Sequence, residues 1–240
     1  MKAIMHSVRP VVVGILLATS GIASAASVTL SGTDVSFTYD DTKMGLFGSP
    51  TVTGNTIFFT PTDFIAQSTN GDGTFLTSST INVVITPNQG KALTSLALTE
   101  RGDYSLDGEG SSVGIGGQLR AFSMNDPINV EDSSFITSAS DLTINDNLYH
   151  NWTAGAGVDL TGAQWQKTSA VDMTLENVLE ATTNGDSFPS KAFIQKKFTG
   201  VGITVGLVPP ASVPVPAALW LFGSGLVGLI GVARRERAAA

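Results

Sequence analysis

The sequence predicts an all-β fold, a single antiparallel β-sandwich of the jelly-roll or a related type. Short runs in which apolar residues alternate with hydroxyl residues, the pattern of half-buried strands, recur along most of the chain. Clusters of Gly, Asn, Asp, Ser and Pro separate these runs at near-regular spacing. About ten to twelve short strands arranged in this way are typical of a sandwich.

The first half of the chain begins with a predicted hairpin. Ser27–Leu30 and Val35–Tyr39 alternate apolar with hydroxyl residues, and the four residues between them have turn chemistry. Pro61 and Pro87 each follow an apolar run and end it, because proline donates no hydrogen bond to a strand ladder. The other runs expected here are Thr56–Thr60, Thr74–Leu76 and Ile81–Ile85, with a turn at Asn70–Gly73.

Two segments need a choice between helix and strand. The leucines of Lys91–Thr99 have nearly helical spacing, but its threonines and Ser95 are poor helix formers, so we expect a strand. Ala170–Ala181 alternates apolar and polar residues, which also favours a strand. The glycine-rich segment Asp103–Gly117 fits a turn, a bulge or a strand closely approached by another backbone.

The second half supplies the remaining strands. The runs expected are Gln118–Met124, Phe135–Ala139, Asn151–Thr153, Gly157–Leu160, Ala192–Phe198 and Val201–Val205. We expect the last two to pair with each other, and Asn184-Gly185 to form a hairpin turn.

The chain has 240 residues, a net charge of −7 and no cysteine. The two terminal segments described next hold five of its basic residues and a single acidic one, so the region between them is more acidic than the whole. Such a charge argues against nucleic acid and anionic lipid surfaces as partners. The lack of cysteine excludes disulfides, thiolate metal sites and a cysteine nucleophile.

The N-terminus has the three parts of a secretory signal peptide. Lys2 and Arg9 form a positive region, Val11–Ala18 is an apolar core, and Ala23-Ser24-Ala25 is a small-residue cleavage site. Cleavage after Ala25 is expected, and cleavage one residue later is the alternative. A retained anchor is disfavoured because the apolar core is too short to span a bilayer. The segment 1–25 therefore predicts export through the Sec translocon.

The C-terminus has the order of parts of a membrane stop signal. An uncharged apolar run, Ala217–Ala233, precedes Arg234, Arg235 and Arg237. As a helix the run covers roughly 25 Å, slightly less than the roughly 30 Å hydrocarbon core, which thinning and snorkelling arginines accommodate. By the positive-inside rule the basic tail, 234–240, stays in the cytoplasm. The alternative, a buried core helix, fits poorly with the missing polar face.

These residues also carry a resemblance to a family of sorting signals. The segment Val213-Pro214-Val215-Pro216-Ala217-Ala218, the apolar run and the Arg cluster resemble the PEP-CTERM signal in its Val-Pro-x-Pro-Ala variant. Val215 stands where the name-giving form has glutamate, which bears on the exosortase subtype. The resemblance covers about a tenth of the chain. It implies cleavage near the proline motif by an exosortase, a membrane cysteine protease, in a Gram-negative bacterium that makes exopolysaccharide.

The predicted organisation is thus a signal peptide (1–25), a sandwich ectodomain (26–208), a Pro-rich linker with the sorting motif (209–216), a transmembrane helix (217–233) and a basic tail (234–240). The protein is expected to be anchored transiently in the inner membrane and then to reach the cell surface or the exterior.

Motifs for catalysis are absent from the sequence. His150 is the one histidine of the predicted ectodomain, and there is no Gly-x-Ser-x-Gly elbow, zinc motif or phosphate-binding loop. Paired carboxylates for glycoside cleavage remain an alternative, since the ectodomain is acidic. We predict a non-enzymatic surface or matrix protein linked to exopolysaccharide or biofilm.

Two binding alternatives accompany this prediction. Trp152 and Trp165 would stack on sugar rings if exposed, as in a carbohydrate-binding module, but they are expected to be core residues. No cofactor is expected, with calcium as the alternative at three loops rich in Asp and Asn. These loops are Asn70 with Asp72; Asp103, Asp107 and Glu109; and Asp141, Asn145, Asp146 and Asn147.

Overall fold

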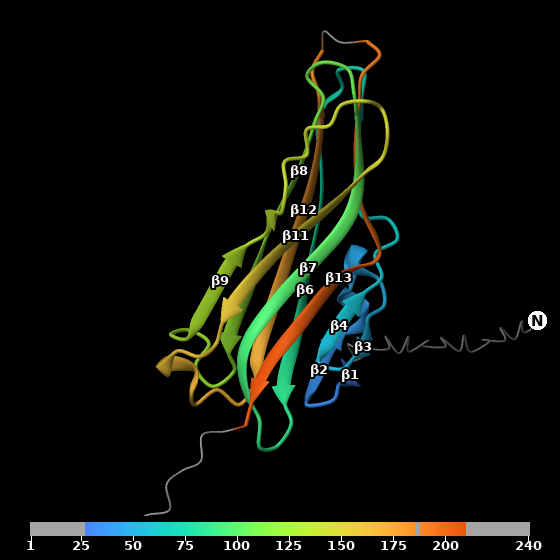
Figure 1. The fold of residues 1–240 in the computed structure, drawn as a ribbon. Helices are drawn as coiled ribbons and strands as arrows, with labels where there is room; N and C mark the ends of the chain where they lie inside the picture. The colour runs from blue at the N-terminus through green and yellow to red at the C-terminus, as the bar shows by residue number, and fades with distance from the viewer. Residues whose placement is uncertain (1–26, 186–187, 210–240) are drawn as a thin grey trace, which may run out of the picture.

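The protein is an all-β sandwich of antiparallel sheets in a computed structural model, which describes residues 27–185 and 188–209 (Figure 1). The six-stranded sheet has the order β1-β2-β6-β12-β8-β9, and the other has the order β10-β11-β7-β13-β4-β3, with β5 paired to β13. The strands of the first sheet are β1 (Ser27–Ser31), β2 (Val35–Asp40), β6 (Gly73–Pro87), β8 (Ser112–Ser123), β9 (Glu131–Phe135) and β12 (Val171–Thr183).

The strands of the second sheet are β3 (Thr51–Thr53), β4 (Thr56–Phe59), β5 (Ile65–Thr69), β7 (Ala92–Asp107), β10 (Thr137–Ser138), β11 (His150–Asp159) and β13 (Lys191–Val208). The described helices are three short 3₁₀ turns, η1 (Asp41–Lys43), η2 (Gly45–Phe47) and η3 (Ala163–Trp165). Among the described residues, no helix is both long and apolar enough to cross a membrane.

Four long strands, β6, β7, β12 and β13, give the molecule its elongated shape (Figure 1). The short N-terminal strands β1 to β4 lie beside the lower half, where the sandwich is broad. The connection 108–111 and residues 184–185 and 188–190 lie at the narrow upper end, and β13 ends at the opposite end with Val208.

The core lies between the sheets because the strands alternate as the sequence predicts. On β12, Val171, Met173 and Leu175 are fully buried, whereas the polar residues between them face outward. Phe47 packs edge-on against Phe59 and Phe64, with ring centroids 5.6 and 5.7 Å apart, and closes the side of this core.

Hydroxyl pairs fix the register on the outer faces. Thr29 and Thr38, Thr56 and Thr204, and Thr74 and Thr182 are directly opposed across neighbouring strands. Their Oγ1 atoms lie 2.8, 2.9 and 2.8 Å apart, respectively. A slip of one residue would separate each pair, so the threonines that alternate with apolar residues also specify the pairing.

Most of the expected strands are confirmed. The first hairpin is β1–β2, and Lys91–Thr99 and Ala170–Ala181 fall almost entirely in β7 and β12, respectively. The glycine-rich segment Asp103–Gly117 contains both a turn and strand residues, which are two of the three expected possibilities. Residues 108–111 turn from β7 to β8, and the glycines from Gly114 to Gly117 lie inside β8.

Other expectations about strand boundaries are wrong. Ala192–Phe198 and Val201–Val205 do not pair with each other; both belong to β13, which continues through a register shift between Lys196 and Val201. Asn184-Gly185 is not a hairpin turn, because β12 and β13 lie in different sheets and the connection crosses between them. Phe135–Ala139 is not one strand either, since β9 ends at Phe135 and β10 lies in the other sheet.

Two pairs of short runs are also joined. Thr74–Leu76 and Ile81–Ile85 are parts of the single strand β6, and Asn151–Thr153 and Gly157–Leu160 overlap the single strand β11. The joining residues are Ser, Thr, Gly and Ala, which carry no alternating apolar pattern but pair normally with their neighbours.

Candidate functional site

A buried ion pair lies between the sheets at the middle of the molecule. Lys196 Nζ of β13 lies 2.5 Å from Glu100 Oε2 of β7, and both side chains are fully buried. Each residue continues an inward-facing series, Ala192 and Ile194 before Lys196, and Leu96 and Leu98 before Glu100. The strand alternation therefore carries both charges into the core, where a lone charge would be strongly destabilising.

Aromatic rings surround the lysine. Its Nζ lies 5.3 Å from the centroid of Phe64 and 5.2 Å from that of Trp152, and its backbone N donates to the carbonyl of Phe64 at 3.0 Å. Both rings favour a cation at this distance, but burial favours the neutral amine. Burial lowers the pKa of Lys196 below the ordinary lysine value, and the nearby Glu100 opposes part of this effect.

The packing of Trp152 depends on a glycine of the neighbouring strand. Trp152 of β11 is paired with Gly102 of β7, and a Cβ at Gly102 would lie 2.3 Å from Cε2 of the ring. Trp152 Nε1 donates to the carbonyl of Asp103 at 3.3 Å. The indole thus lies against the backbone of β7 and excludes water from the ion pair.

Polar atoms without partners occur in the same layer of the core. Glu100 Oε1 is buried without a hydrogen bond, and so are both Oδ1 and Nδ2 of Asn177 in β12. Asn177 is fully buried and faces inward between Leu175 and Leu179. Leaving a buried amide without hydrogen bonds costs on the order of 1–3 kcal/mol. An apolar side chain at position 177 would therefore stabilise the fold more than this asparagine does.

No sequence motif marks this site. Lys196, Glu100 and Asn177 belong to no motif and are far apart in the chain. The sequence does carry one indication of it. Each of the three residues stands at a position of an alternating strand where the pattern otherwise has an apolar, inward-facing residue.

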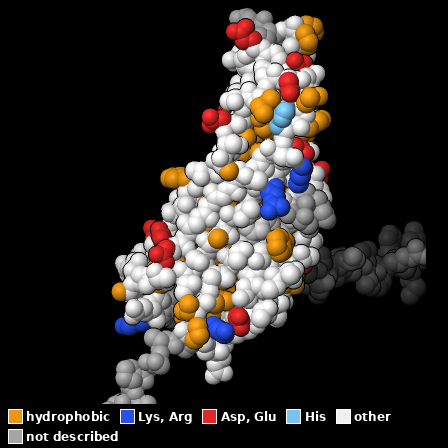
Figure 2. Space-filling model, in the orientation of Figure 1, with side chains coloured by type: hydrophobic (Ala, Val, Ile, Leu, Met, Phe, Trp, Pro, Cys, Tyr) orange, Lys and Arg blue, Asp and Glu red, His pale blue; other side chains and the backbone are white. Residues whose placement is uncertain are grey.

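An exposed aromatic cluster lies near the narrow upper end of the molecule. The rings of Tyr149 and Phe193 meet edge-to-face with centroids 5.6 Å apart, and Lys191 Nζ lies 5.3 Å from the Tyr149 centroid. The side chain of Tyr149 is exposed. Figure 2 shows hydrophobic side chains gathered around the pale-blue histidine on this part of the surface. We call Tyr149, Phe193 and Lys191 the aromatic cluster.

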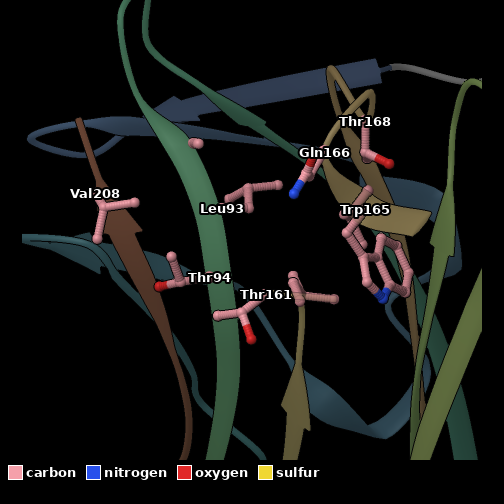
Figure 3. A pocket seen from close by; sticks show the side chains of 10 residues that line it. Leu93, Thr94, Thr161, Trp165, Gln166, Thr168 and Val208 are labelled. Atoms are coloured by element: carbon pink, nitrogen blue, oxygen red, sulfur yellow. The ribbon is translucent and has the colours of Figure 1, made fainter. Parts of the chain in front are cut away.

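A cavity of about 220 Å³ lies at the opposite end, where β13 ends (Figure 3). Trp165, Leu93 and Val208 contribute apolar surface to it, and threonine hydroxyls line its sides. The ten lining residues include no charged side chain, so they offer no acid or base. They are Ala92, Leu93, Thr94, Leu160, Thr161, Trp165, Gln166, Thr168, Val171 and Val208.

The two tryptophans considered as sugar-stacking residues are core residues. Trp152 is 2% exposed and Trp165 is 5% exposed, so neither presents a ring face to solvent. Stacking of a sugar on Trp152 or Trp165 is therefore wrong, and the expectation that they belong to the core is confirmed.

The loops considered for calcium use their polar atoms in local hydrogen bonds. Asp72 accepts from Thr69, Asn145 donates to the carbonyl of Gly108, and Asp103 accepts from Gln195 Nε2 at 2.7 Å. Across the described ranges, no three His, Asp or Glu side chains are grouped as a metal site would require. Asn70 and Asn147 take positive φ values, as turn residues do.

His150 is joined to its own loop rather than to a serine. Its Nε2 lies 2.8 Å from Asp146 Oδ1, and its ring packs on that of Tyr104. The expected sorting motif Val213–Ala218 and the expected cleavage site Ala23–Ala25 lie outside the described residues, as do Arg234, Arg235 and Arg237.

Comparisons with known proteins leave the family open. No protein-family model and no curated protein matches the sequence. Among solved structures, the chain is similar to infectious bursal disease virus Gt strain (15% identity, 80% of this chain, 51% of that chain, TM-score 0.22). It is also similar to the VP2 subviral particle of infectious bursal disease virus (15% identity, 72% and 49% covered, TM-score 0.18). The chain spans about half the length of these structures. Similarity at such TM-scores carries no argument about function.

Proposed function

We propose that this chain is an exported cell-surface or extracellular matrix protein without enzymatic activity, which an exosortase sorts through its C-terminal segment. The observation that carries the proposal is the order of parts at the C-terminus: Pro214-Val215-Pro216, the apolar run Ala217–Ala233 and the arginine cluster. The signal peptide at 1–25 supports export.

The fold is compatible with display outside the cell. The strands alternate between the sheets from β6 to β8 and from β11 to β13, as in a jelly-roll-like sandwich, and β13 ends at Val208, just before the Pro-rich linker. A linker rich in proline is extended and semi-rigid, so it would hold the sorting motif away from the ectodomain. We propose that the mature protein lies in the exopolysaccharide of the bacterium that makes it.

Mass spectrometry of the C-terminus in two hosts tests the proposal. In a host with a matching exosortase, the mature protein should lose the segment after roughly Pro216, and in a host without one Ala240 should remain. The double change Pro214→Ala/Pro216→Ala should prevent cleavage, whereas Pro209→Ala/Pro210→Ala, in the same linker but outside the motif, should leave it intact. Retention of Ala240 in both hosts would refute sorting.

A carbohydrate-binding function is the second candidate, and the aromatic cluster favours it. Tyr149 presents an exposed ring, and Lys191 beside it supplies a hydrogen-bond donor. Sugar recognition needs such a combination of ring face and polar group. Tyr149→Ala should abolish binding to a glycan array that includes exopolysaccharide from the bacterium that produces the protein. Phe135→Ala, at an exposed aromatic of β9, is the control and should not change it.

A further inference from the structure

The strand registers bring Asn177 to the level of the buried ion pair. Ile65 of β5 is paired with Gln195 of β13, and its carbonyl accepts from Thr77 Oγ1 of β6 at 2.7 Å. Thr77 in turn is paired with Leu179 of β12. Gln195 and Leu179 therefore lie at the same height on the two sheets.

Toward the lower end, the next inward-facing residue of each strand is a reacting group. From Gln195 the antiparallel strand β13 runs toward the lower end and reaches Lys196, and from Leu179 the same direction along β12 leads to Asn177. Glu100 also lies on this lower side. Lys196 is paired with Gly102 of β7, and Glu100 is two residues nearer the lower end of β7 than Gly102. β12 packs on β13, and all three side chains face the interior.

The chemistry of the three groups is complementary. Burial favours the neutral amine of Lys196, which is nucleophilic, whereas a solvated ammonium is not. Asn177 supplies a carboxamide that has no other partner. Glu100 Oε2 accepts a hydrogen bond from Lys196 Nζ, and Glu100 Oε1 has no hydrogen-bond partner. A carboxyl group in this arrangement can take a proton from one group and deliver it to another.

We propose that Lys196 and Asn177 are joined by an intramolecular isopeptide bond, which forms in the folded chain with Glu100 as the catalytic residue. Lys196 Nζ attacks Cγ of Asn177 and forms the new C–N bond. Glu100 accepts the proton from Nζ and delivers it to Nδ2, the bond between Cγ and Nδ2 breaks, and ammonia leaves. Atoms and charge balance without any oxidant or cofactor, and the dry core protects the product from hydrolysis.

The bond would link β12 of one sheet covalently to β13 of the other. An exported chain without cysteine has no disulfide for this purpose. The link would also account for the choice of a lysine, an asparagine and a glutamate at positions where apolar side chains would otherwise be expected.

Tryptic peptide mapping of the full chain, purified under native conditions, tests the proposal. Asn177 lies in the peptide 168–191 and Lys196 lies in 192–197, because an acylated Lys196 is not cleaved. We expect a branched species with two N-termini, Thr168 and Ala192, and a mass one ammonia below the sum of the two peptides. A linear missed-cleavage product has one N-terminus and lacks one water instead, so fragmentation distinguishes them.

Three variants assign the roles, and a fourth, Lys197→Arg, is the control. Glu100→Gln keeps the size of the side chain and should leave the two peptides separate, and Lys196→Arg should do the same. Asn177→Asp should still react, with loss of water in place of ammonia. Lys197→Arg changes the neighbouring exposed lysine and should form the bond fully.

The wild-type protein decides the matter even if a variant fails to fold. Separate, unmodified peptides from folded wild-type protein would overturn the proposal. A bond to a carboxyl group would lack water instead, for example in a branched species that joins 192–197 to the peptide 92–101 through Glu100, and would also overturn it. A bond that forms fully in a folded Glu100→Gln variant would remove Glu100 from the mechanism.

Discussion

The indole of Trp152 lies against the α-carbon of Gly102 on the neighbouring strand. A Cβ at Gly102 would lie 2.3 Å from Trp152 Cε2 and 2.0 Å from the carbonyl oxygen of Gln195. Neither neighbour has room to move, because the indole is almost fully buried and the carbonyl belongs to β13. The absence of a side chain at Gly102 therefore positions the ring that covers the buried ion pair.

Gly102→Ala should destabilise the protein by about 1–3 kcal/mol, the usual cost of overpacking a core. Urea denaturation followed by tryptophan fluorescence measures the change in the free energy of unfolding. Gly157→Ala is the matched control in the same sheet, because the nearest atom to its added Cβ is 3.9 Å away. Equal stabilities of the two variants would contradict the proposed packing.

The alternation of the sequence was enough to predict the sandwich and the faces of its long strands. Residues such as Met173 and Leu175 are buried where the period of two places them. The connections were less predictable. Val201 is in the same strand as Lys196 because β13 accommodates a bulge there, and a Gly at position 200 resembles a turn signal in sequence.

The interior site was not predicted because its residues are charged or polar. A lysine or glutamate in a strand is normally assigned to the solvent face, and only long-range pairing shows that Lys196 and Glu100 meet. Trp152 was predicted to be a core residue, as tryptophans of such a β-domain more often are, but its role over Gly102 depends on the β7–β11 register. The proposed sorting motif, by contrast, rests on a local pattern of consecutive residues.

Lys196→Met should destabilise the protein by about 3–5 kcal/mol, because it leaves the buried carboxyl group of Glu100 without its partner. The double change Lys196→Met/Glu100→Leu removes that group and should recover part of the loss. If the isopeptide bond is present, a deficit of about 3 kcal/mol should remain, as for the loss of any cross-link that closes a short loop. Thermal and urea denaturation measure both steps, and full recovery by the double variant would argue against the cross-link.

Thr74 and Thr182 should be energetically coupled, because their hydroxyls lie 2.8 Å apart at directly opposed positions of β6 and β12. A double-mutant cycle with Thr74→Val and Thr182→Val should give a coupling of about 0.2–1 kcal/mol. Thr74 and Thr204 lie in different sheets and serve as the control pair, for which additivity is expected. A coupling as large in the control pair would mean that the opposed hydroxyls do not interact specifically.

Asp146 should titrate below the ordinary range. The hydrogen bond from His150 and that from the backbone N of Leu148 hold the pKa of the Asp146 carboxyl below its usual value. Because the folded pKa is lower than the unfolded one, the stabilisation is present above the unfolded value of about 3.9 and is lost as the pH falls through the folded pKa.

His150→Ala removes the larger of these contributions, so the pKa of Asp146 should rise toward its ordinary value, while the bond from Leu148 retains part of the shift. Carboxyl chemical shifts followed by NMR between about pH 2 and 6 measure it. Asp159, whose pKa is lowered by bonds from Thr161 instead, is the internal control and should titrate unchanged in the variant. If the two carboxyls respond alike, or if Asp146 does not move, the hydrogen bond from His150 is not the cause of the shift.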